Sequence, residues 1–235
     1  MVFKQQTYLL VPGAWMGAWI WDSTISSLQS QGHTAYTLNL SGLDRTKSSD
    51  KVDDIALETH VTDVLTFIEA KQLDGITIVG HSYSGIVVGQ VANRIPDKIK
   101  HIIYINAFLP QDGKALVDDF GEGQAEQERN EIMANGGWWL PPILDGIAIE
   151  TDLSHEQQLW LNSQLVPHPG RTVTDTVQLS KPLLTQNATY IACRTTDESS
   201  DEIQTLCKEY GWQFYRLNAG HWPMVSVLDN LIKLL

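Results

Sequence analysis

The stretch that decides the fold is GITIVGHSYSG, residues 75–85. Residues 75–79 are almost wholly apolar, which is typical of a central strand buried on both faces of a parallel sheet. Residues 86–92 follow with a helical pattern. A serine that stands directly between such a strand and such a helix, with small residues beside it, is typical of a nucleophile elbow. Ser82 is therefore the candidate nucleophile.

The rest of the chain alternates strand patterns with amphipathic helix patterns. Helices are expected at 21–32, 57–68 and 225–235, in addition to the one after the elbow. Strands are expected at residues 7–11, 34–40, 75–79, 99–105, 189–193 and 213–217. This alternation predicts an α/β fold with a mainly parallel six-stranded sheet and helices on both faces. Ligands of such sheets bind beyond the carboxyl ends of the strands.

Residues 110–181 break the alternation, since this interval is richer in Gly, Pro, Trp and polar residues. Trp138, Trp139 and Trp160 lie within it and are costly to leave in water. We interpret the interval as an inserted helical cap over the site. A chain of 235 residues is long enough for one sizeable core, so a single domain over 1–235 is expected.

Charge and composition exclude several classes of partner. The net charge of −12 disfavours nucleic acid and anionic membrane surfaces. No stretch approaches ~20 consecutive apolar residues, and the N-terminus lacks a secretory pattern, so a cytoplasmic protein is expected. Cys193 and Cys207 are then expected to be buried thiols rather than a disulfide. The expected partner is a small molecule, and the chain is expected to be a monomer or a homodimer.

The elbow departs at one position from the G-x-S-x-G pattern. Gly80 supplies the first small residue, whereas the second is Ser84, followed at once by Gly85. Small residues are needed because the helix and the strand approach closely. The alternative, a chance Gly/Ser loop, is disfavoured by the strand and helix on either side.

A serine hydroxyl is a weak nucleophile and needs a neighbouring base. His221 lies in AGHWP, residues 219–223, between the last expected strand and the final helix. The base is expected there when the chain order is Ser, acid, His. The other histidines lie in the elbow, on helices, at strand starts or in the cap, and those outside the elbow are interpreted as structural or surface residues.

The acid that orients the base should follow the preceding strand, which places it at Asp197. Glu198 and Asp201 lie close enough to compete. Some enzymes of this plan take the acid from the strand after the nucleophile, which would indicate Asp112.

An oxyanion hole needs two backbone N–H groups, one from the residue after the nucleophile and one from the loop after the first strand. These are predicted to be the N–H groups of Tyr83 and Ala14. The loop PGAWMGAW, residues 12–19, has the small residues that close backbone approach requires.

Four segments together resemble a known family. They are PGAWMGAWIW (12–21), GHSY (80–83), NAFLP (106–110) and GH (220–221). They resemble the α/β-hydrolases that include plant methyl-ester hydrolases, plant hydroxynitrile lyases and bacterial pyrethroid-hydrolysing carboxylesterases, over nearly the whole chain. The resemblance implies a six-stranded core with a helical cap, no metal or cofactor, and a triad of Ser82, His221 and Asp197. Pro12 stands where the family usually has His, and Ser84 where it usually has Gly.

Ester hydrolysis through an acyl-enzyme is the leading hypothesis for function. A carbon–carbon lyase of the hydroxynitrile type is the second hypothesis. The resembling lyases carry Thr at the position of Gly13 and Lys after the catalytic His. This chain has Gly13 and Trp222 at these positions, so it lacks the residues that the lyases use. A small-molecule receptor with slow turnover is the third.

The predicted pocket is apolar and partly aromatic, which favours small, uncharged, hydrophobic esters. Its predicted lining residues are Gly13, Trp15, Trp138, Trp139, Trp160 and Trp222.

Overall fold

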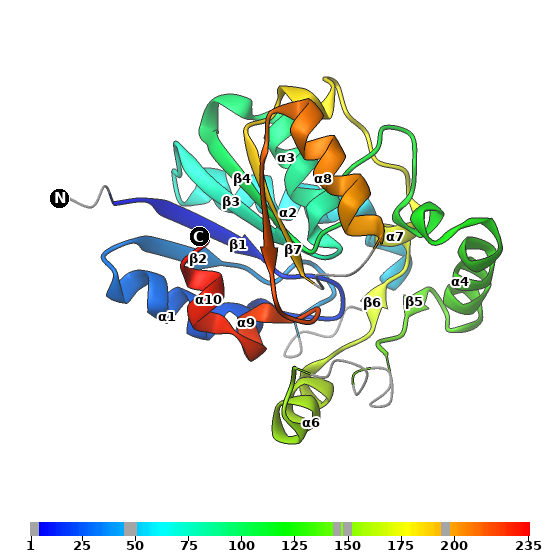
Figure 1. The fold of residues 1–235 in the computed structure, drawn as a ribbon. Coiled ribbons are helices and arrows are strands. Elements are labelled where there is room, and N and C mark those ends of the chain that lie inside the picture. Colours follow the sequence, from blue (N-terminus) through cyan, green and yellow to red (C-terminus); the bar gives the residue numbers. More distant parts are fainter. Residues whose placement is uncertain (1–4, 45–50, 143–146, 148–151, 194–197) are drawn as a thin grey trace.

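The computed structural model describes residues 5–44, 51–142, 147, 152–193 and 198–235. Its centre is a six-stranded sheet in the order β2-β1-β3-β4-β7-β8, with all neighbours parallel (Figure 1). The strands are β1 (Thr7–Val11), β2 (Thr34–Thr37), β3 (Ile76–His81), β4 (Ile99–Ile105), β7 (Ala188–Cys193) and β8 (Gln213–Leu217). The predicted α/β fold is confirmed, and each expected strand overlaps an observed one.

Helices cover both faces of the sheet (Figure 1). One face carries α1 (Asp22–Ser30), α9 (Pro223–Ser226) and α10 (Leu228–Ile232), and the other carries α2 (Leu57–Ala70), α3 (Ser84–Arg94) and α8 (Glu198–Tyr210). Short 3-10 helices are η1 (Ala18–Trp21), η2 (Val52–Asp54), η3 (Pro96–Lys98), η4 (Leu116–Phe120) and η5 (Leu183–Thr185). Successive side chains of a strand point to opposite faces, so each strand contributes to two apolar cores. Ile78 packs with the α2 and α3 side, and Val79 with the α1 and α10 side.

The strand order places a ligand site beside β1. The chain leaves β1 for β2 at one edge and returns through β3 on the other side, and such a reversal leaves a crevice at the carboxyl ends of the strands. Val11 pairs with Gly80, and His81 pairs with Ile105. Because the strand ends align, the loop after β1, Ser82 and Asn106 meet at one edge of the sheet.

The predicted C-terminal helix differs from the observed structure. Two short helices, α9 and α10, replace one continuous helix over 225–235. Val227 between them has φ −139° and ψ 45°, outside the helical region. The apolar spacing did identify a buried face, since Leu231 is fully buried, but a one-residue interruption leaves no trace in that spacing.

The segment 110–181, which we call the cap segment, adds structure between β4 and β7. It contains α4 (Glu122–Ala134), α6 (His155–Gln164) and α7 (Arg171–Thr174). An antiparallel ribbon joins β5 (Trp138–Trp139) to β6 (His168–Pro169). Figure 1 shows α4 and α6 set off from the sheet, with the ribbon between them. The ribbon was not predicted, because two-residue strands are too short to have a readable period.

Both cysteines are buried and unpaired, as expected. Burial raises the pKa of the Cys193 thiol to about 12 and that of Cys207 to about 11, so both stay protonated near neutral pH. Within the described ranges, no helix has the length and apolar character needed to cross a membrane.

Candidate active site

Ser82 occupies a strained turn between β3 and α3. Its φ is +53°, a left-handed conformation that is costly for a residue with a side chain. The turn requires small neighbours: a Cβ at Gly80 would lie 2.6 Å from Val88 Cγ2, and one at Gly85 would lie 2.2 Å from the Phe108 carbonyl oxygen. Strand and helix therefore meet as a nucleophile elbow requires.

Ser84, the departure from the usual motif, is fully buried and hydrogen-bonded. Its hydroxyl oxygen lies 2.8 Å from the His81 amide nitrogen, which donates to it, and 2.9 Å from the Val11 carbonyl oxygen, to which it donates. A serine at this position thus ties the elbow to the end of β1, and the close approach of the backbone falls on Gly85 instead.

His221 lies in the loop between β8 and α9, beside Ser82. Its Nε2 is 3.0 Å from Ser82 Oγ, within hydrogen-bond distance. His81 Nε2 is 2.7 Å from the His221 carbonyl oxygen, and the Gly220 amide donates to Asp152 Oδ2 at 2.7 Å. These contacts fix the loop on two sides. The structure thus brings together two of the predicted catalytic side chains, Ser82 and His221.

Asn106 also contacts His221, which the sequence reasoning did not anticipate. Its side-chain nitrogen lies 2.7 Å from His221 Nδ1, and its φ is +43°. Asparagine tolerates this left-handed conformation better than most residues. The available signal was its position directly after β4, the strand that follows the nucleophile.

The predicted acid, Asp197, lies outside the described residues, and so does the side chain of Glu198. Asp201 forms an ion pair with Arg216 on the surface. Asp112 Oδ1 accepts a hydrogen bond from the Leu179 amide at 2.8 Å, so this carboxylate holds a loop of the cap segment.

Both residues of the predicted oxyanion hole are buried, Ala14 after β1 and Tyr83 after the nucleophile. Gly13 packs against the elbow, because a Cβ there would lie 2.8 Å from both His81 Nδ1 and Met16 Cε. The loop after β1 therefore lies directly on the nucleophile turn.

A cavity of about 1170 Å³ borders His221 and Asn106. Its walls include Phe108, Leu183 and Tyr190. Its charged lining residues are mostly acidic: they are the carboxylates Asp112, Asp119 and Glu202 and the ammonium of Lys181. Burial raises the pKa of the Asp119 carboxyl. Among the described lining residues, Lys181 is the one permanent cation, so the cavity is poorly suited to an anionic ligand.

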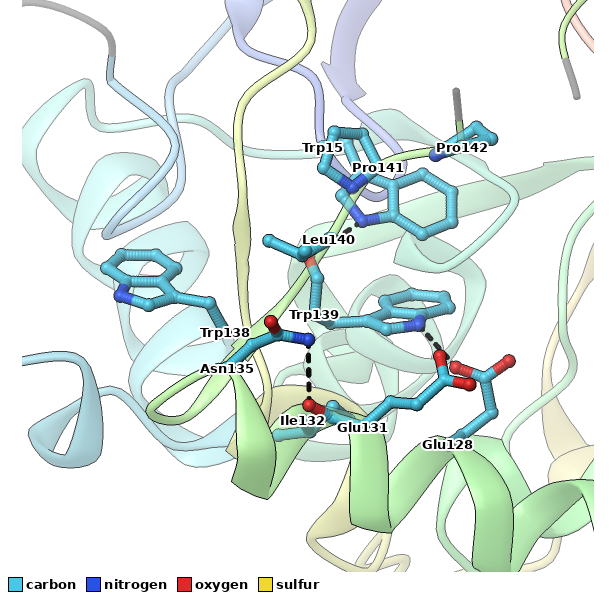
Figure 2. Close-up of a pocket in the computed structure, with 10 residues that line it drawn as sticks. All are labelled: Trp15, Glu128, Glu131, Ile132, Asn135, Trp138, Trp139, Leu140, Pro141 and Pro142. Atoms are coloured by element: carbon cyan, nitrogen blue, oxygen red, sulfur yellow. Dashed lines mark hydrogen bonds between the residues drawn. The ribbon is translucent and has the colours of Figure 1, made fainter. Parts of the chain in front are cut away.

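None of the predicted pocket tryptophans is among the described residues that line this cavity. Trp15, Trp138 and Trp139 line a second cavity of about 330 Å³, whose described lining does not include His221. Figure 2 shows the Trp139 indole nitrogen directed at Glu128, a contact of 2.8 Å. Trp160 is 43% exposed and packs edge-on against a neighbouring indole.

Trp222 is buried, and its ring centre lies 5.2 Å from that of His221. Of the predicted pocket aromatics, it is the one in ring contact with the candidate base. In the parts of the chain that the structure describes, no group of three or more His, Cys, Asp or Glu side chains could hold a metal ion.

Comparison with known proteins gives the family. The model of the alpha/beta hydrolase family matches residues 8–232, and the chain belongs to this family. A carbendazim-hydrolyzing esterase from Nocardioides sp. (strain SG-4G) is 29% identical over 96% of each chain. Methylesterase 2 of Arabidopsis thaliana is 32% identical over 46% of this chain and 41% of its own length. These relatives support ester hydrolysis in general.

A solved structure agrees on the fold. An extracellular α/β-hydrolase from a Paenibacillus species superimposes with a TM-score of 0.81 over 97% of both chains, at 23% identity. At this identity the likeness establishes the shared fold alone.

Proposed function

We propose that the chain hydrolyses carboxylic esters of small hydrophobic compounds through an acyl-enzyme formed on Ser82. The observation that carries the proposal is the 3.0 Å contact between His221 Nε2 and Ser82 Oγ at a strained elbow. A serine activated by an adjacent imidazole is the arrangement that nucleophilic acyl transfer requires.

The proposed reaction has two halves. Ser82 Oγ attacks the ester carbonyl carbon while its proton passes to His221 Nε2, and the N–H groups of Ala14 and Tyr83 stabilise the resulting oxyanion. The tetrahedral intermediate collapses, and His221 returns the proton to the departing alkoxide oxygen. Water then attacks the acyl-enzyme with His221 again as base, which releases the acid and restores the serine.

The tautomer of His221 determines the roles of its neighbours. A base that accepts a proton at Nε2 carries its own proton on Nδ1, so Nδ1 needs an acceptor. We assign that role to Asp197 from the chain order, because a carboxylate also stabilises the imidazolium. The neutral Asn106 amide can support the ring only through its oxygen, which requires a half-turn of the amide from the observed arrangement.

The substrate class follows from charge and lining. The acid-rich cavity beside His221 disfavours a second carboxylate on the substrate, and its Phe108, Leu183 and Tyr190 side chains favour apolar groups. The names of the relatives, a carbendazim-hydrolyzing esterase and a methylesterase, support ester hydrolysis, and the second name supports an ester with a small alcohol. Crowding at Gly13 speaks against the lyase hypothesis, because a threonine side chain there would meet His81 and Met16.

The test is a panel of p-nitrophenyl and methyl esters of graded acyl length, with purified protein and the Ser82→Ala variant. We expect hydrolysis by the unmodified protein and a loss of at least about 10³-fold in kcat for Ser82→Ala. Ser163→Ala, at an exposed position on α6, is the matched control and should keep full activity. Retention of more than about a tenth of the activity by Ser82→Ala would remove Ser82 from the mechanism.

A further inference from the structure

The residue that follows Ala14 is held in a strained conformation by the cap segment. Trp15 has φ +64°, which is unusual for a bulky side chain. Its indole nitrogen donates to the Trp139 carbonyl oxygen at 3.0 Å, and its carbonyl oxygen accepts from the Val166 amide at 3.0 Å. The Trp15 and Trp139 rings lie 4.2 Å apart between centres (Figure 2). A strained turn persists only where its surroundings over-determine it, and here the surroundings are cap residues.

The third hydrogen bond to Trp15 involves His168, a buried side chain of β6. The Trp15 amide nitrogen lies 3.2 Å from His168 Nδ1 and donates to it. His168 Nε2 lies 2.8 Å from Thr172 Oγ1, whose hydroxyl donates to the Pro169 carbonyl oxygen at 2.6 Å. Nδ1 must therefore be the acceptor, and Nε2 carries the proton. Burial lowers the pKa of His168, so the ring stays neutral and keeps this acceptor.

Trp139 and His168 are direct partners in the β5–β6 ribbon. One strand of the ribbon thus holds the Trp15 indole and the other holds its amide. The Trp15 amide is bonded to His168 and is therefore not available to an oxyanion, which leaves the preceding N–H, that of Ala14, as the candidate donor of this loop.

The same cluster contacts the second predicted oxyanion residue. The Tyr83 ring lies 4.6 Å from that of His168. Its hydroxyl lies 2.8 Å from His60 Nδ1, and His60 Nε2 lies 2.8 Å from the Ser41 carbonyl oxygen. A carbonyl only accepts, so Nε2 carries the proton and the Tyr83 hydroxyl donates to Nδ1. His60, Tyr83 and His168 are all buried.

We propose that His168 is a positioning residue for catalysis, which holds the Trp15 turn so that the Ala14 N–H points at the developing oxyanion. The inference rests on the proposed ester hydrolysis. It assigns to the cap segment a part in the oxyanion hole, beyond covering the site. Misplacing one donor of an oxyanion hole lowers kcat more than it raises KM, because the contact strengthens in the transition state.

The test compares His168→Phe with His168→Asn. Phenylalanine keeps a ring but has no acceptor, whereas the asparagine side-chain oxygen can take the place of Nδ1. We expect His168→Phe to lower kcat by about 10- to 100-fold with less than about a threefold change in KM. His168→Asn should recover most of the loss. Binding of a trifluoromethyl ketone, which forms a tetrahedral oxyanion adduct with the serine, should weaken in parallel with kcat/KM.

A control and an independent readout complete the test. His101→Phe removes a half-buried histidine near the start of β4 and should leave kcat unchanged. Hydrogen exchange at the Trp15 amide should accelerate in His168→Phe and not in His101→Phe. If Trp15 loses protection while kcat stays within threefold, the positioning role is wrong. Failure of the proposed function would look different, since no Ser82-dependent ester turnover would then exist in the unmodified protein.

Discussion

The carboxyl edge of the sheet and the cap segment contribute to the candidate site in different ways. At the sheet edge, Ser82 and Asn106 directly follow strands in parallel register, so the pairing of β3 with β4 brings them together. In the cap segment, the β5–β6 ribbon holds Trp15 through hydrogen bonds to Trp139 and His168 and a ring contact, and Val166 adds a third hydrogen bond. Topology thus places the reactive groups, whereas long-range contacts set the strained turn beside them.

The largest effect is expected for the acid that we assign to His221 from the chain order. Asp197→Asn should lower kcat by about 10³- to 10⁴-fold, because an amide neither fixes the same tautomer nor stabilises the imidazolium. Steady-state kinetics on one ester at saturating concentration measures it. Asp201→Asn and Asp112→Asn are the controls, since these carboxylates bind Arg216 and the Leu179 amide. If Asp112→Asn proved the most damaging of the three, the acid would have been assigned to the wrong strand.

The same contrast explains how far the sequence predicted the molecule. Strand periods and chain order identified Ser82 and His221 as candidates, because each residue lies in the turn or loop after a strand of the parallel sheet. Asn106 was missed as a partner of His221, since its role depends on the register of β4 against β3 rather than on a motif. His168 was interpreted as a structural or surface residue, and its contact with Trp15 was missed because it joins residues far apart in the chain. Cap aromatics were expected at the pocket, but Trp138 and Trp139 line a separate cavity.

Buried histidines should make stability depend on pH. Burial lowers the pKa of His60 and of His81 to about 4, while the unfolded values are near 6.5. Between these values the unfolded chain binds more protons than the folded chain, so the free energy of unfolding falls as pH decreases through this window. We expect a loss of about 2 kcal/mol for each such histidine between pH 7 and pH 5.

Urea unfolding at pH 7, 6 and 5 measures this loss. His60→Phe should show a shallower dependence, because one titrating group is gone. Carboxylates whose pKa is lowered, such as Glu58 and Asp118, lose their contribution mainly below pH 5, so they change the unfolding free energy little between pH 7 and pH 5. An unfolding free energy that stays constant from pH 7 to pH 5 would contradict burial of these neutral rings.

A smaller effect is expected for Asn106, which distinguishes a supporting amide from the orienting acid. Asn106→Ala should lower kcat by about 10-fold, since the lost hydrogen bond loosens His221 but leaves the charge of Asp197 in place. Asn106→Gly keeps the left-handed backbone accessible and serves as the matched variant. Equal losses in both variants would locate the effect in the side chain. A loss as large as that of Asp197→Asn would make Asn106 the main partner of Nδ1.

The smallest effect is expected for Trp222, and it tests whether the base loop or the cap segment lines the substrate pocket. Trp222 is buried beside His221, and its indole nitrogen has no hydrogen-bond partner among the described residues. Trp222→Phe therefore removes no protein hydrogen bond and keeps most of the packing, so the fold should survive. We expect KM for bulky apolar esters to rise about 3- to 10-fold and KM for acetate esters to change less than twofold, because a wall contact acts through the larger group.

Trp160→Phe, at an exposed cap position, is the control and should change neither KM. Equal changes for both ester classes in Trp222→Phe would show that the indole orients His221 rather than the substrate. A selective change in Trp160→Phe instead would move the wall of the pocket to the cap segment, because only a side chain that touches the larger acyl group can discriminate by its size.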